Sequence, residues 1–158
     1  MGKKKNIPDS IRSIVLSEAD FQCVYCGQRD GMNLTLHHII PERDGGKAEY
    51  SNLIALCFNC HHRVEDKKTI PEKEIKKIKR HLVNKRLTQP GVNALKIAYK
   101  DSFGVIAPPF SVQHLLDDKL LEHIEAERYF VSIDGETEAT ARYRITKKGK
   151  ELTERWIL

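Results

Sequence analysis

The chain of 158 residues contains no apolar run that approaches the roughly 18 residues of a membrane-spanning helix. The lysines at positions 3 to 5 are not followed by the hydrophobic core of a signal peptide. Asn6 stands where an N-myristoylation motif beginning at Gly2 requires Ser or Thr. These absences favour a cytoplasmic protein that has no membrane partner.

The length and the charge limit the architecture further. A chain of this size forms one or two small domains and has no room for a large enzyme body. Residues 1–88 hold 17 Lys and Arg against 11 Asp and Glu, whereas residues 89–158 hold 10 against 11. Positive charge concentrated in the first part favours a polyanionic partner, such as a nucleic acid, for that part.

The chain has only four cysteines, and they form two Cys-x-x-Cys pairs, Cys23 with Cys26 and Cys57 with Cys60. Two residues between cysteines let both sulfurs of one turn reach a single tetrahedral ion, and two such turns complete four ligands. A single Cys-x-x-Cys pair would also be compatible with a redox site. The reducing cytosol disfavours disulfides. Four paired cysteines therefore predict a structural zinc site.

Thirty residues separate the two pairs, more than an ordinary zinc ribbon needs. This insert contains His37-His38, Gly45-Gly46 and Asn52, and His61 directly follows the second pair. Ligand-capable and proton-accepting side chains thus lie inside the segment that zinc would hold together.

The order and spacing of these residues closely resemble the HNH endonuclease family, in its zinc-stapled branch, over roughly residues 8 to 66. His38 precedes Asn52 by 14 positions and Asn52 precedes His61 by 9, as the family pattern expects. The resemblance implies a ββα-metal fold and a metal-dependent nuclease that hydrolyses DNA phosphodiester bonds. The competing hypothesis is a non-catalytic, zinc-stapled module that acts as a DNA- or protein-binding adaptor.

The resemblance also implies residue roles. His38 is the general base, since an imidazole accepts a proton near neutral pH. His37 and His61 bind a catalytic divalent metal such as Mg²⁺ or Mn²⁺, and Glu65, one helical turn after His61, is a further candidate ligand. Asn52 ties the loop back and orients the base. Adjacent strand residues point to opposite faces, so His37 and His38 can divide their roles between metal and water.

The alternative for these histidines is a structural role beside the zinc. The remaining histidines have no motif context and are expected at the surface or at helix caps; they are His62, His81, His114 and His123.

We expect an α+β chain with a basic leader (1–7), a nuclease domain (8–68), a basic connecting helix (69–88) and a winged-helix-like domain (89–158). In the nuclease domain the pattern predicts a helix from residue 8, strands over 34–38 and 52–56, and a helix over 58–66. The connecting helix either follows a phosphate backbone or is simply solvated. Its polar face carries Lys73, Lys76, Lys77, Lys79, Arg80 and Lys85.

In the C-terminal part the pattern predicts a helix over 92–101 and a long helix from Ser111 to Ile124. A β-hairpin that turns at Asp134-Gly135 and a last helix capped by Thr146 follow. Winged-helix DNA readers usually present a basic helix, but this segment is acidic, so we expect it to bind a protein partner or a second copy. The acidic residues are Asp117, Asp118, Glu122, Glu125 and Glu127, and Arg142 and Arg144 alone remain for a phosphate contact.

Overall fold

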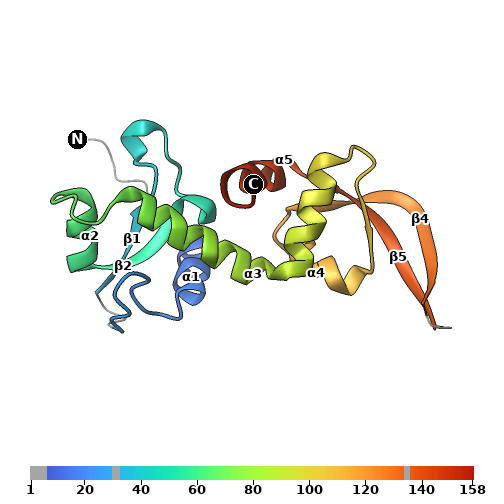
Figure 1. Ribbon diagram of the computed structural model, residues 1–158, viewed down its shortest axis with the longest axis horizontal. Helices are drawn as coiled ribbons and strands as arrows, with labels where there is room; N and C mark the ends of the chain where they lie inside the picture. The colour runs from blue at the N-terminus through green and yellow to red at the C-terminus, as the bar shows by residue number, and fades with distance from the viewer. Residues whose placement is uncertain (1–6, 30–32, 134–135) are drawn as a thin grey trace. The chain divides into compact units, whose positions relative to one another are not determined.

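The computed structural model describes residues 7–29, 33–133 and 136–158, and it has a mixed α+β architecture (Figure 1). Most of the expected basic leader and the expected turn at Asp134-Gly135 lie outside the described residues. Contacts divide the chain into two compact units, residues 1–82 and 83–158. Among the described residues, no helix has the length and apolar character required to cross a lipid bilayer.

The first unit begins with helix α1 (Asp9–Glu18), which starts directly after Pro8 as predicted. Its apolar side chains recur on one face, where Val15 is buried. The helix contacts strand β2 (Leu53–Cys57) and the short helix η2 (Tyr50–Asn52). Helix α1 therefore covers the small core around the sheet.

A two-stranded antiparallel sheet follows, formed by β1 (Leu34–His38) and β2 (Leu53–Cys57) (Figure 1). The register pairs His37 with Ile54 and His38 with Leu53. Every residue of β2 is buried, so this strand forms the centre of the unit. The prediction of β1 is confirmed at both ends, and that of β2 is confirmed within one residue.

Two one-turn helices connect the strands, η1 (Glu42–Asp44) and η2 (Tyr50–Asn52). Helix α2 (Phe58–Glu65) leaves the end of β2 directly and packs on both strands. Strand, loop, strand and helix thus form a ββα unit, in agreement with the fold that the resemblance implied.

Helix α3 (Glu72–Lys100) leads from the first unit into the second and is broken at Thr88, whose φ of 60° and ψ of 160° are not helical. The expectation that Lys79 lies on a solvated polar face is wrong. Lys79 is fully buried, and its Nζ donates to Glu18 of α1 at 2.7 Å. Lys73, Lys76, Lys77 and Arg80 do lie on the exposed face.

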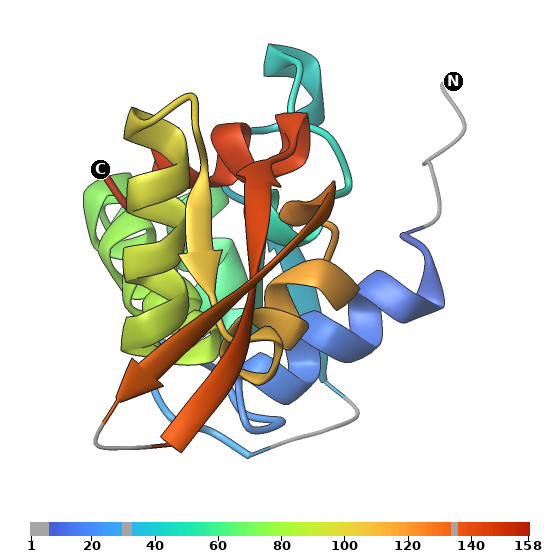
Figure 2. The same cartoon turned by 90° about the vertical axis from the view of Figure 1, so that its right-hand side faces the viewer.

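The second unit contains a three-stranded antiparallel sheet in the order β3-β5-β4, in which β3 lies beside β5 (Figure 2). The strands are β3 (Val105–Ala107), β4 (Leu121–Ile133) and β5 (Glu136–Ile145). The predicted hairpin is confirmed by the pairing of β4 with β5. Strand β3 was not predicted, because three residues are too few to show an alternating pattern.

Two helices complete the second unit, α4 (Pro109–Asp117) and α5 (Lys147–Trp156). The cap of α5 is confirmed, since the Thr146 side chain accepts from the backbone N–H of Gly149. The prediction of a long helix from Ser111 to Ile124 is wrong. Helix α4 ends at Asp117, Lys119 adopts a left-handed φ of 57°, and Leu121 then pairs with Ile145.

That correction also removes the acidic helix. Asp117 and Asp118 lie at the end of α4, whereas Glu122 lies on β4 and pairs with Arg144. Leu115, Leu120 and Leu121 repeat at a helical spacing but reach the core from a helix, a turn and a strand. Apolar spacing alone does not distinguish one continuous helix from a helix followed by a turn and a strand.

Candidate metal centres and active site

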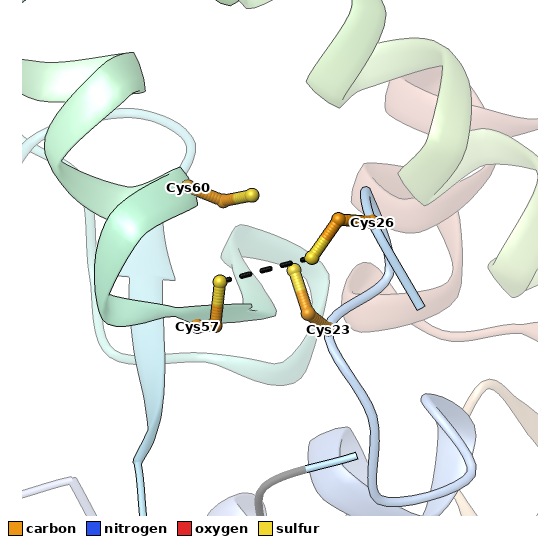
Figure 3. A group of neighbouring side chains, drawn as sticks. All are labelled: Cys23, Cys26, Cys57 and Cys60. Carbon is orange, nitrogen blue, oxygen red and sulfur yellow. Dashed lines mark hydrogen bonds between the residues drawn. The ribbon is translucent and has the colours of Figure 1, made fainter. Parts of the chain in front are cut away.

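The four cysteines converge at the junction of β2, α2 and the turn after α1 (Figure 3). Their sulfur atoms all lie within 4.8 Å of one another, and none forms a disulfide. The Sγ atoms of Cys26 and Cys57 are 3.8 Å apart. Sulfurs bound about 2.3 Å from one tetrahedral zinc are separated by about 3.8 Å. The cluster therefore fits the predicted zinc ion.

The local backbone favours the thiolate form of one cysteine in this cluster, Cys23. Burial raises the pKa of the Cys23 thiol, but backbone N–H groups, that of Cys57 first among them, outweigh this effect and bring the pKa to about 7. Burial instead raises the pKa of Cys60. A bound cation would stabilise the deprotonated forms of all four sulfurs together, because its positive charge offsets their negative charges.

A second group of ligand-capable side chains contains His37, His61 and Glu65, whose ligand atoms also lie within 4.8 Å of one another. Nδ1 of His37 is 3.4 Å from one Glu65 oxygen, and Nδ1 of His61 is 3.6 Å from the other. Ligand atoms about 2.1 Å from one ion lie roughly 3.0 to 3.5 Å apart in octahedral or tetrahedral geometry. These spacings fit a single divalent metal.

His37 supplies independent support for this fit. Its Nδ1 atom is buried and has no hydrogen-bond partner within the described part of the chain. Burial lowers the pKa of His37, and the neighbouring His61 lowers it further, while Glu65 opposes the shift. His37 therefore presents a neutral imidazole, which is the form that binds a metal.

His38 is the neighbour of His37 in the sequence, but it is not one of the three side chains of this ligand-capable group. His37 and His38 both line a groove of about 660 Å³, together with Arg43, Glu65 and Lys68. Nε2 of His38 is buried without a hydrogen-bond partner among the residues that the structure describes, and it lies 3.8 Å from Glu42. No sequence motif marks Glu42; its position four residues after His38, across Pro41, is the available signal.

Asn52 is not part of the ligand group and is almost completely buried. Its Nδ2 donates to the carbonyls of Ile40 and Lys47, both at 3.0 Å, and its Oδ1 accepts from the N–H of Ile40 at 2.9 Å. The backbone carbonyl of Asn52 also accepts from the N–H of Ile39. Asn52 thus fastens the segment that directly follows His38.

The side chains of the other four histidines do not line the groove. His62 and His81 are exposed, and His62 pairs with Asp66, which directly follows α2 and itself lines the groove. His114 bonds the carbonyl of Leu87 at the break in α3, and the ring of His123 packs edge-on against that of Tyr143.

Comparison with known proteins gives a family match within the first unit. The family model described as HNH endonuclease matches residues 23–67, the segment that contains both candidate metal centres. The curated protein anaredoxin from Nostoc sp. is 37% identical over 41 residues. That match covers 26% of this chain and 53% of anaredoxin, so the chain spans about half the length of this relative.

Proposed function

We propose that the first unit is a metal-dependent HNH endonuclease that hydrolyses DNA phosphodiester bonds. The observation that carries this proposal is the shared groove. His38, a proton acceptor, and His37 and Glu65, two candidate metal ligands, line the same cavity. Hydrolysis requires both an activated water and stabilisation of negative charge at the phosphate, and these residues can supply the two together.

In this mechanism His38 is the general base. It accepts a proton from the attacking water, and the resulting hydroxide attacks phosphorus. Nε2 of His38 is buried, so Nδ1 is the nitrogen left to receive that proton. Asn52 holds the chain directly after His38 through its side-chain hydrogen bonds, which keeps the ring at the groove.

His37, His61 and Glu65 would hold the divalent metal, which when bound supplies Lewis-acid stabilisation of the phosphate and the leaving oxygen. The groove has a carboxylate-rich lining that opposes phosphate entry without a cation. Acidic lining residues are Asp44, Glu65, Asp66 and Glu72, against the basic Arg43 and Lys68. Substrate binding at the groove therefore depends on the metal as well.

The alternative is a zinc-stapled adaptor without catalysis. The four-cysteine centre fits either function, because a structural zinc stabilises a binding module equally well. The groove favours the nuclease, since an adaptor has no need for a buried neutral histidine beside a second histidine and a carboxylate.

We also propose that the second unit selects the partner and contributes no chemistry. Its order of helix, strand, helix, hairpin and helix supports a winged-helix-like architecture. Arg144 is already paired with Glu122 at 2.6 Å, and the guanidinium of Arg142 lies over the ring of Phe103. A protein partner or a second copy therefore fits this unit better than a phosphate backbone does.

The test is cleavage of supercoiled plasmid by the full chain in EDTA, Mg²⁺, Mn²⁺ or Ni²⁺. The parent should nick or cut only with metal. His38→Ala should lower the rate by about 10² to 10⁴ while zinc content and DNA affinity stay unchanged. His81→Ala, at an exposed position outside the groove, is the matched control. Cleavage by His38→Ala at the parental rate under every metal would rule out the assigned base.

A further inference from the structure

The Nε2 atom of His38 raises a question that the proposed mechanism does not answer. The atom is buried and has no hydrogen-bond partner among the described residues. A buried N–H without an acceptor is unfavourable, because it has lost its hydrogen bond to water and gained none in the protein. If the proton were on Nδ1 instead, that nitrogen could not act as the base, and Nε2 is buried. A working base at this position therefore needs an acceptor near Nε2.

Glu42 is the carboxylate placed to serve as that acceptor. Its Oε1 atom lies 3.8 Å from Nε2 of His38, about 1 Å beyond a charge-assisted hydrogen bond. The Glu42 side chain is 48% exposed, so it can change rotamer without disturbing the core.

The backbone that carries Glu42 is held in place on both sides. Pro41, directly before it, accepts from the N–H groups of Asp44 at 2.9 Å and Gly46 at 3.0 Å. Asn52 binds both backbone groups of Ile40. The loop therefore fixes the backbone position of Glu42, and only its side-chain rotamer can change.

We propose that Glu42 is a positioning residue for His38: it accepts a hydrogen bond from Nε2–H and thereby fixes the tautomer whose Nδ1 is free to accept a proton. This inference rests on the proposed nuclease function. When water gives its proton to Nδ1, the Nε2 proton stays on the ring, and the carboxylate stabilises the imidazolium that forms.

Steady-state cleavage by the full chain separates this role from a structural one. Glu42→Gln keeps an acceptor but loses the charge, and Glu42→Ala loses both. We expect kcat to fall about 10-fold for Gln and about 100-fold for Ala, with KM within about 2-fold of the parent. Glu42→Asp keeps the charge on a shorter side chain and should recover part of the loss. Glu49→Gln, in the same loop and paired with Lys47, is the matched control.

A measurement independent of activity tests the same idea. Long-range ¹H–¹⁵N correlation of the histidine rings, with His38 assigned from the signals that disappear in His38→Ala, reports its tautomer. The parent should show the Nε2–H form, and Glu42→Ala should show a mixture. A parent ring protonated on Nδ1, or the same tautomer and the same kcat in Glu42→Ala, would overturn the proposal. If the parent shows the Nε2–H form but cleaves no DNA with any metal, the nuclease function fails while the role of Glu42 in fixing the ring stands.

Discussion

At the scale of single residues, the loop after His38 depends on two adjacent glycines, Gly45 and Gly46. A Cβ atom built on Gly46 would lie 1.8 Å from the carbonyl oxygen of Ile40 and 2.8 Å from Nδ2 of Asn52. Gly45 has open space around its Cβ position but adopts a φ of 84°. The two adjacent glycines are therefore needed for different reasons.

This difference gives a paired prediction. Gly45→Ala should cost roughly 1 to 2 kcal/mol, the cost of a left-handed conformation with a Cβ. Gly46→Ala should cost about 3 kcal/mol or more, because the backbone of Ile40 must move and the Asn52 hydrogen bonds break. Urea unfolding of both zinc-loaded variants measures the difference. Equal losses would show that the close approach at Gly46 is relieved easily.

The composition of the ligand group predicts its metal preference. Two imidazoles and one carboxylate favour Mn²⁺, Ni²⁺ or Zn²⁺ over Mg²⁺, which prefers oxygen ligands. We expect half-maximal cleavage at a lower concentration of Mn²⁺ or Ni²⁺ than of Mg²⁺. His61→Ala should raise the required concentration by about 10-fold or more without loss of structural zinc. An unchanged metal requirement in His61→Ala would exclude it as a ligand.

At the scale of elements, one buried cluster joins helices α1 and α3 to the turn that carries Asn52. Nζ of Lys79 donates to Oε2 of Glu18 and lies 3.9 Å from the ring centroid of Tyr50. The hydroxyl of Tyr50 donates to the other carboxylate oxygen of Glu18. Tyr50 begins η2, and Asn52 ends it. The cluster therefore supports the loop through the backbone of a single helical turn.

Breaking this cluster should destabilise the first unit strongly. Lys79→Met leaves the buried carboxylate of Glu18 without its cation, and we expect a loss of about 3 to 5 kcal/mol. Adding Glu18→Gln should recover part of the loss, since a neutral amide is less costly to bury. Lys77→Met, on the exposed face of the same helix, should stay within about 0.5 kcal/mol of the parent. Chemical denaturation measures the free energy of unfolding of each variant. A small loss of stability in Lys79→Met would mean that water reaches the Glu18 carboxylate.

At the scale of the whole molecule, the four-cysteine centre connects segments that are far apart in the sequence. It joins the turn after α1 to the end of β2 and the first turn of α2. The core of the first unit is small, and a bound structural zinc contributes directly to folding in domains of this size.

Zinc removal should therefore unfold the first unit. We expect one tightly held zinc per chain, and a chelator strong enough to remove it should abolish the cooperative unfolding transition of this unit. Cys57→Ser should have the same effect. Elemental analysis and circular dichroism measure both outcomes. Freshly purified protein without zinc, or a Cys57→Ser variant as stable as the parent, would contradict the assignment.

The two units should also differ in how they bind DNA. Residues 1–87, which end before the break at Thr88, carry 17 Lys and Arg against 11 Asp and Glu. Residues 83–158 retain the buried Val83 and Leu87 and carry 12 against 11. We expect the first fragment to nick plasmid and to bind duplex with an affinity that falls steeply with salt. Tight, salt-sensitive binding by the second fragment would instead identify it as a DNA reader.

Features that depend on local spacing could be predicted from the order of the residues alone. The Cys-x-x-Cys pairs, strand β1, helix α2 and the Thr146 cap follow from residues close together in the chain, and the structure has each of them. His37 and His61 were both proposed from the motif, and the structure brings them together with Glu65. Short-range patterns are reliable here because each is satisfied within a few residues.

Features that depend on contacts between distant residues could not be predicted from local patterns and became visible in the folded chain. In the sequence, Lys79 is indistinguishable from its exposed lysine neighbours. It is buried because it forms an ion pair with Glu18, 61 residues away. Leu120 and Leu121 continue a helical spacing, but pairing with β5 draws Leu121 into a strand. Glu42 has no motif around it, and its proximity to His38 arises from the loop that Asn52 closes. Long-range contacts override local periodicity because a buried charge or an unpaired strand costs more than a change in local conformation.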